Sequence, residues 1–251
     1  MLKDKVFHIV IPKQGNSEQE CEDSISIQAT KKQNKRIRLR VAIADGATES
    51  SFAKEWSDLL TKSFNKSKLP LKEYLLTSLL DLRKKWTTLI QDKPLPWYAQ
   101  EKAENGAFSA FLGVRLDFEK HSYEAIAIGD CCFFHVRKET VIKQFPVKNA
   151  LDFGNNPYLI SSKQSKNIEL ENYLIEVSDT LIKGDIIFMM SDALAHWFMK
   201  NNELNEHPWN ILLGLKGKTK EERQRFISWL TEQRALKEIK NDDVVLAIIE
   251  L

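Results

Sequence analysis

Carboxylates at the ends of apolar strands are the residues of this sequence best suited to chemistry. Asp45-Gly46 follows residues 37–44, whose alternating pattern predicts a strand that ends in a carboxylate. The glycine lets the backbone there approach a ligand closely. Asp192 ends a second apolar run, and Asp242 opens a third. Burying acidic groups at such places costs free energy unless a cation neutralises their charge.

Acidic residues occupy five strand boundaries in all: Asp23, Asp45, Asp130, Asp192 and Asp242. Carboxylate oxygens suit hard divalent cations such as Mg²⁺ and Mn²⁺. Two such ions can share a carboxylate and activate a water for in-line attack on phosphorus. The sequence lacks the histidine and cysteine spacing of a zinc site and the glycine-rich loop of a phosphate cradle. Aspartate is also common at turns and caps, and taken singly each residue is better explained in that way: Asp130 fits a hairpin turn and Asp192 a helix N-cap, so it is the joint pattern that favours a cation site.

Strand patterns and helical patterns occur in separate blocks along the chain. Helical spacing begins after Ser50, after Pro70 and after Asp192, and the last helix is expected to start at Thr219 with Glu222 completing a capping box. Runs of strands and runs of helices favour antiparallel sheets with helices packed outside them. Because there is no repeat or linker, one domain spanning 1–251 is expected. Strands are predicted at 6–11, 23–27, 37–45, 108–116, 123–128, 131–136, 173–177, 185–190 and 244–249.

Composition and charge exclude several classes of protein. The net charge is +2, from 37 basic and 35 acidic residues, so nucleic acid is not an expected partner. The basic run at 31–36 is interpreted as a hairpin tip. No apolar run approaches the roughly 20 residues of a membrane span, and the start lacks a signal-peptide core. Of three cysteines, Cys131 and Cys132 are adjacent and should face opposite sides of a strand. A cytoplasmic protein is expected.

The order of motifs resembles the metal-dependent protein phosphatases of type 2C, also called the PPM family, across essentially the whole chain. Each fragment is degenerate, but six in the family's order are hard to obtain by accident. The resemblance implies an α+β fold, a four-layer α-β-β-α sandwich of two antiparallel sheets flanked by helices. The six fragments are Cys21-Glu22-Asp23-Ser24, Ala44-Asp45-Gly46, Gly106-Ala107-Phe108, Ile128-Gly129-Asp130-Cys131, Ser191-Asp192-Ala193 and Asp242-Asp243-Val244-Val245.

The resemblance also implies a centre of Mg²⁺ or Mn²⁺ ions at one end of that sandwich. Asp45 would bridge two ions, and the Gly46 carbonyl would supply a further ligand. Asp192 and Asp242 would complete the direct shell of one ion. The nucleophile would be the bridging water, so Asp45, Asp192 and Asp242 are the expected catalytic residues.

Three further acidic residues have weaker roles in the family pattern. Glu22 and Asp23 would act mostly through metal-bound waters. Asp130 would help to hold a third, weaker ion together with Asp192. The expected cofactor is therefore two ions, with a third that binds less tightly.

The sequence departs from the family pattern where the substrate phosphate would be held. Relatives place an arginine or histidine shortly before the Glu-Asp pair, and residues 15–20 contain neither. Lys13 is the nearest cation and is the candidate substrate-binding residue, although an ammonium lacks the fork of a guanidinium. Ala193 replaces the usual glycine, and Val245 replaces a threonine or serine.

The predicted function is hydrolysis of phosphoserine or phosphothreonine monoesters on proteins, in signalling. A phosphorylated protein is then the substrate, and a cognate kinase is a candidate partner. A catalytically weak pseudophosphatase that serves as a regulatory binding module is the alternative, which the missing arginine keeps open. A sandwich-fold nuclease using the same carboxylates is disfavoured by the balanced charge.

Overall fold

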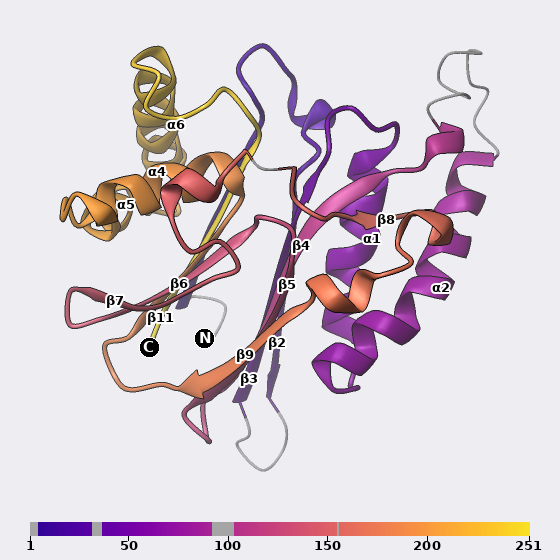
Figure 1. Cartoon of the computed structure of the whole chain (residues 1–251). Coiled ribbons are helices and arrows are strands. Elements are labelled where there is room, and N and C mark those ends of the chain that lie inside the picture. Colours follow the sequence, from indigo (N-terminus) through magenta and orange to yellow (C-terminus); the bar gives the residue numbers. More distant parts are fainter. Residues whose placement is uncertain (1–4, 32–36, 92–102, 155) are drawn as a thin grey trace.

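Two antiparallel sheets pack face to face in the computed structural model, which describes residues 5–31, 37–91, 103–154 and 156–251 (Figure 1). Sheet A has the strand order β1 (Val6–Ile11), β11 (Val244–Glu250), β10 (Ile186–Met190), β6 (Cys132–Arg137), β7 (Thr140–Phe145). Sheet B has the order β2 (Ser24–Lys31), β3 (Ile37–Gly46), β4 (Phe108–Asp117), β5 (Ser122–Ile128), β9 (Ile175–Thr180), and the short β8 (Ile160–Ser161) also pairs with β4.

Helices cover the outer face of each sheet. The helices α1 (Ala53–Lys66) and α2 (Leu71–Gln91) lie on sheet B, and α4 (Asp192–Glu203), α5 (Pro208–Leu215) and α6 (Lys220–Ala235) lie on sheet A (Figure 1). This arrangement confirms the predicted α-β-β-α sandwich. Within the described residues, no helix combines the length and apolar character needed to cross a membrane. Single turns of 3-10 helix occur at η2 (Glu18–Glu20), η3 (Ala150–Asp152), η4 (Gln164–Lys166) and η5 (Leu170–Tyr173).

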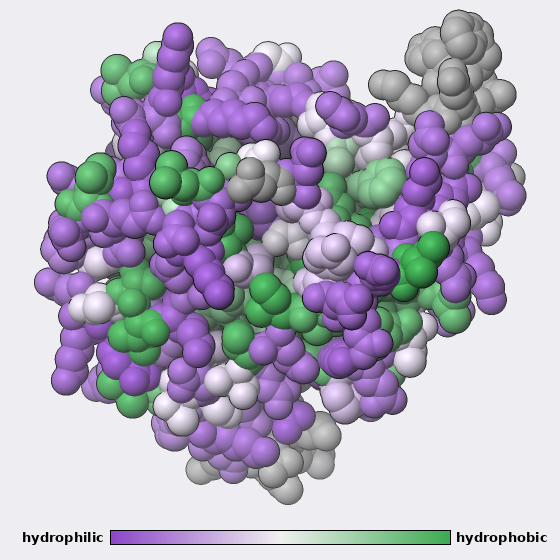
Figure 2. Space-filling view, viewed as in Figure 1, coloured by the Kyte–Doolittle hydropathy of each residue, from purple (hydrophilic) through white to green (hydrophobic). Residues whose placement is uncertain are grey.

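The alternation in β3 explains how the layers are held together. Leu39, Val41 and Ile43 are fully buried between the two sheets. Ala42 and Ala44 face the opposite way, into the core between sheet B and its helices. Their small side chains leave room for the aromatic residues of the helices to pack. The surface in Figure 2 is mainly hydrophilic, with hydrophobic residues in scattered groups, as expected when the cores lie between layers.

The interpretation of Asp130 as a hairpin residue is wrong. The strands on either side belong to different sheets, since β5 pairs with β4 and β9, and β6 pairs with β10 and β7. Gly129 has φ +91°, and a Cβ there would lie 2.5 Å from the Cβ of Ala110, so only glycine fits this crossing. Cys131 then packs between the sheets and Cys132 packs against the helices, as predicted.

The predicted helix start at Thr219 is confirmed. Its side chain accepts a hydrogen bond from the Glu222 amide at 3.1 Å, and the Glu222 carboxylate accepts one from the Thr219 amide at 2.9 Å. The strands β2 and β3 form an antiparallel pair. Residues 32–36 lie outside the described residues, so the hairpin-tip interpretation of the basic run stays a prediction.

Candidate metal centre

The acidic residues of sheet B lie at one end of the sandwich because their strands end there together. Asp45 is the penultimate residue of β3. Asp23 directly precedes β2, and Ser24 pairs with Ala44 in the register of the two strands. Asp130 lies in the crossing that leads from this sheet to sheet A. Residues that are 22 positions apart in sequence, Asp23 and Asp45, are thereby neighbours in space.

The acidic residues of sheet A reach the same end. Asp192 follows β10 and Asp242 precedes β11, and these two strands are paired. The Ser191 amide donates to the Val245 carbonyl at 3.1 Å, which joins the end of β10 to the start of β11. Asp192 is the first residue of α4 and the N-cap position is Ser191, so the interpretation of Asp192 as an N-cap is wrong by one residue.

Asp45 is at the electrostatic centre of this cluster. Burial by surrounding protein atoms raises its pKa well above the usual value, and the charges of four other aspartates raise it further, in the order Asp23, Asp192, Asp130 and Asp242. Like charges at this range disfavour the ionised form. The five carboxyl groups that the sequence singled out are therefore near one another, on both sides of the gap between the sheets.

Asp23 is a buried member of the cluster whose carboxylate lacks hydrogen-bond partners. Its side chain is fully buried, and burial followed by the charge of Asp243 holds its pKa well above the usual value. Neither carboxylate oxygen accepts a hydrogen bond of normal geometry, although the Ser191 hydroxyl is close enough to lower the pKa. Burial and the charge of Asp192 raise the pKa of Asp130 to about 7. A buried anion without partners is expensive unless a cation compensates it.

Asp192 and Asp242 form the sheet A side of the cluster. Burial raises the pKa of Asp192 and the charge of Asp242 raises it further, whereas the charge of Lys240 and the hydrogen bond from the Ala193 amide lower it. Lys240 pairs with Asp242 at 2.6 Å, and this contact raises the pKa of the lysine, with smaller contributions from Asp192 and Asp45.

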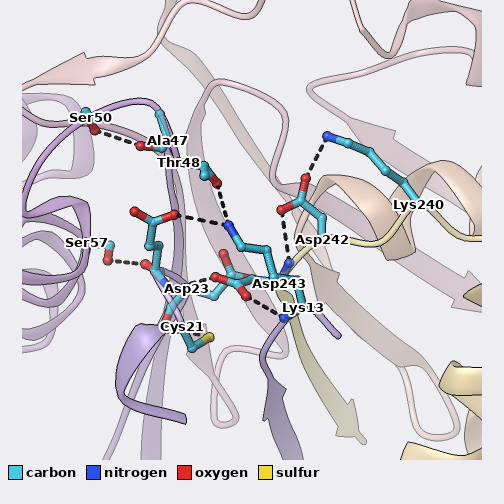
Figure 3. A network of polar contacts seen from close by, with 11 residues as sticks. Lys13, Cys21, Asp23, Ala47, Thr48, Ser50, Ser57, Lys240, Asp242 and Asp243 are labelled. Atoms are coloured by element: carbon cyan, nitrogen blue, oxygen red, sulfur yellow. Dashed lines mark hydrogen bonds and ion pairs between the residues drawn. The ribbon is translucent and has the colours of Figure 1, made fainter. Parts of the chain in front are cut away.

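Asp243 clamps the two chain segments that carry Glu22 and Lys13 (Figure 3). One carboxylate oxygen accepts a hydrogen bond from the Lys13 amide at 2.7 Å, and the other accepts one from the Glu22 amide at 2.7 Å. The Lys13 ammonium then lies 4.0 Å from Glu22 Oε2 and donates to the Thr48 hydroxyl at 3.3 Å. Burial raises the pKa of Glu22. The predicted substrate-binding lysine is thus at the edge of the acidic cluster.

Gly46 is the one predicted site residue without a side chain, and its place explains why. A Cβ at this position would lie 2.9 Å from the Glu22 carbonyl oxygen and 2.9 Å from the Cβ of Ala53. No room therefore exists for a side chain at Gly46, where β3, the start of β2 and the first turn of α1 meet. The close approach keeps the backbone of Gly46 beside Asp45 and Glu22.

The donor chemistry of the cluster suits a hard cation. The side chains of Asp23 and Glu22 present buried oxygens without hydrogen-bond partners, and every other acidic side chain of the cluster is an oxygen donor as well. As these side chains stand, no group of three or more His, Cys, Asp or Glu residues in the described part of the chain could hold a metal ion. The individual ligand roles stay predictions.

Sequence reasoning missed two residues that shape the site, Asp243 and Lys240. Both lie within two positions of Asp242, which was itself predicted. The signal for Asp243 was the unexplained second acid at the start of an apolar strand, where only one was assigned a role. Nothing local indicated Lys240, because its proximity to Asp192 comes from the pairing of β10 with β11, and its proximity to Asp45 comes from the packing of the two sheets.

Comparisons with known proteins match this chain through its structure. No protein-family model and no curated protein matches the sequence. Serine/threonine phosphatase Stp1 from Staphylococcus aureus superposes with a TM-score of 0.63 at 17% identity, covering 100% of this chain and 95% of that chain. The Mycobacterium tuberculosis serine/threonine phosphatase PstP/Ppp gives 0.62 at 14% identity, covering 98% and 97%.

A third solved structure, RsbX in complex with magnesium, gives a TM-score of 0.53 at 18% identity and covers 97% of this chain and 92% of that chain. At such identities the matches establish the fold. This chain therefore has the fold of these two serine/threonine phosphatases and of RsbX, and the fold that the sequence resemblance implied is confirmed.

Proposed function

We propose that this protein, as one phosphatase domain spanning 1–251, is a metal-dependent serine/threonine protein phosphatase. The observation that carries the proposal is the position of Asp45, whose pKa is raised by burial and by four aspartates from both sheets. Carboxylates gathered in this way at a strand end are suited to divalent ions, and the fold supports phosphoester hydrolysis. The substrate would be a phosphorylated protein.

Bound Mg²⁺ or Mn²⁺ ions would supply a water activated for attack on phosphorus. The side chains of Asp45, Asp192 and Asp242, with the Gly46 carbonyl, would hold the ions directly. The outer carboxylates Glu22 and Asp23 would orient bound waters, and Asp130 would help Asp192 to hold a third, weaker ion, since all of them lie around the same cluster.

Lys13 would hold the substrate phosphate at the edge of the cluster. Its ammonium is already positioned by the Thr48 hydroxyl and the Glu22 carboxylate, at the distances given above. An ammonium neutralises one charge of a phosphate but cannot form the two parallel hydrogen bonds of a guanidinium. Binding of the phosphate group is therefore expected to be weaker than with an arginine at this place.

Hydrolysis of p-nitrophenyl phosphate and of a phosphothreonine peptide tests this proposal, measured with Mn²⁺ and with EDTA. Turnover should require Mn²⁺ and should fall in Asp45→Asn by more than the roughly 10–100-fold that loss of an outer partner costs. Asp81→Asn, an exposed change on α2, is the matched control and should leave the rate unchanged. Turnover that persists in EDTA, or in Asp45→Asn, contradicts the proposal.

One observation favours the alternative, a regulatory pseudophosphatase. Arg234 of α6 is next to the centre, but it donates to the backbone oxygens of Pro12 and Asp242. Its guanidinium therefore holds these two segments together and does not take the place of the phosphate-binding arginine that residues 15–20 lack. Titration calorimetry with Mn²⁺ separates the two functions: binding of Mn²⁺ without any turnover supports the binding module.

A further inference from the structure

A polar cavity, far from the acidic cluster, opens at the opposite end of sheet B. Its volume is about 420 Å³. Five cationic side chains line it, against three carboxylates. The lining residue of β3 nearest to Asp45 is Arg40. It is five residues from Asp45 along the strand, a distance of roughly 16 Å. The five cations are Arg38, Arg40, Lys68, Arg115 and Lys120.

The strand register creates this basic cluster. Arg38 and Arg40 occupy the face of β3 that carries Ala42 towards α1, and that helix ends at Lys66. Arg115 of β4 is directly opposite Arg40. Like charges in directly opposed positions destabilise a sheet, so such a pair needs a compensating group. The pKa of Arg115 is accordingly lowered, first by burial and then by the charge of Arg40.

Backbone carbonyls at the end of α1 account for part of this arrangement. Arg40 Nη1 donates to the carbonyl of Asn65 at 2.9 Å and to that of Ser67. Arg115 Nη1 donates to the carbonyl of Leu69. The contacts of Arg40 satisfy acceptors that the helix leaves free at its C-terminal end, and the contact of Arg115 satisfies an acceptor in the connection between α1 and α2. They use the Nη1 atom of each guanidinium.

The other edge of the Arg115 guanidinium has no partner. Its Nε and Nη2 atoms are buried and form no hydrogen bond. The group lies 5.2 Å from the centre of the Phe64 ring, which holds its orientation. Glu124 is opposite Arg115 in the register of β4 and β5, yet it does not accept from this edge. Nε with Nη2 is the edge that binds two oxygens of a phosphate or carboxylate in parallel.

We propose that this cavity binds a phosphoryl group, with the free edge of Arg115 forming the fork. Lys68 and Lys120, both exposed, would neutralise the remaining charge at the mouth. The surplus of cations over carboxylates favours a doubly charged oxyanion. Inorganic phosphate and a phosphorylated side chain present the same group. The inference goes beyond the phosphatase activity and does not depend on it.

Binding is measured by calorimetry with the full chain in EDTA, so that no divalent ion recruits phosphate to the acidic cluster. The titrants are inorganic phosphate, a phosphothreonine peptide and the same peptide without phosphate. We expect one saturable site that weakens with salt. Tighter binding of the phosphopeptide than of free phosphate would assign the site to a phosphorylated chain, and the reverse would assign it to the free anion.

Two variants and a matched control complete the experiment. Lys68→Gln/Lys120→Gln removes two exposed charges, and Arg115→Lys keeps the charge but removes the fork. Each should weaken phosphate binding by roughly tenfold or more, the cost of losing a charge-assisted hydrogen bond. The control Lys84→Gln/Lys85→Gln has the same charge change on exposed positions of α2 and should bind as the wild type does.

Two results overturn the inference. The first is the absence of saturable phosphate binding to the wild-type protein in EDTA. The second is equal affinity in Lys68→Gln/Lys120→Gln and in its control. Circular dichroism of each variant confirms the fold, and the double lysine variant keeps the test decisive if Arg115→Lys is unstable, because neither lysine is buried.

Discussion

Asp130→Asn tests whether charge repulsion within the acidic cluster lowers the stability of the folded protein when no metal is bound. The pKa of Asp130 is about 7 in the folded protein, against a usual value of 3.8, because of burial and the charge of Asp192. A difference of roughly 3 in pKa corresponds to roughly 4 kcal/mol of stability lost once the group is ionised. Relaxation of the neighbouring carboxylates makes this an upper bound.

The sign of the effect follows from proton binding. Between pH 3.8 and about 7 the folded protein holds a proton on Asp130 that the unfolded chain has released. Stability without metal therefore falls as the pH rises through this window, and the penalty is absent below it. An asparagine carries no such penalty. In EDTA, Asp130→Asn should thus be more stable than the wild type at about pH 8 and equal to it at about pH 4.

Urea unfolding at both pH values, with EDTA and then with Mg²⁺, measures this prediction. The exposed Asp81→Asn is the control for a change of one charge and should show no such pH dependence. Mg²⁺ should stabilise the wild type more than Asp130→Asn, since the lost carboxylate is one of the oxygen donors. The reasoning is refuted if Asp130→Asn is no more stable than the wild type at about pH 8 in EDTA.

Two further substitutions test how the backbone around the site is held. Asp243→Ala should lower the free energy of unfolding by about 1–3 kcal/mol in urea, because the amides of Lys13 and Glu22 lose their acceptor; unchanged stability would show that the clamp is unimportant. Gly46→Ala should cost about 1–3 kcal/mol, since its Cβ would lie 2.9 Å from the Glu22 carbonyl oxygen. Gly214→Ala, with nothing within 4 Å of the added Cβ, is the control and should not destabilise through contact.

The sequence was sufficient for the parts of the site that depend on local pattern. The alternation up to Ala44 predicts where β3 ends, and therefore where Asp45 is placed. Separate runs of strands and helices predict the layers. Since paired strands end together, carboxylates at their ends were expected to meet, and the electrostatics around Asp45 agree with this.

Long-range pairing was beyond the reach of the sequence. The contacts of Asp243 join it to amides 230 and 221 positions away. A Gly-Asp step looks the same in a hairpin as in the crossing at Gly129, because the assignment of strands to sheets is not local. The unpaired edge of Arg115 arises from the register of β4 against β3, which the sequence does not display, whereas a contiguous basic run such as 31–36 is visible in the sequence itself.

A crystal structure of the protein grown with Mn²⁺ and measured near the manganese absorption edge tests the central claim most directly. Anomalous density should appear among the carboxylates of Asp45, Asp192 and Asp242, next to the Gly46 carbonyl. The same crystals of Asp45→Asn should lose it. Folded wild-type protein in saturating Mn²⁺ with no anomalous density among these carboxylates would contradict the account.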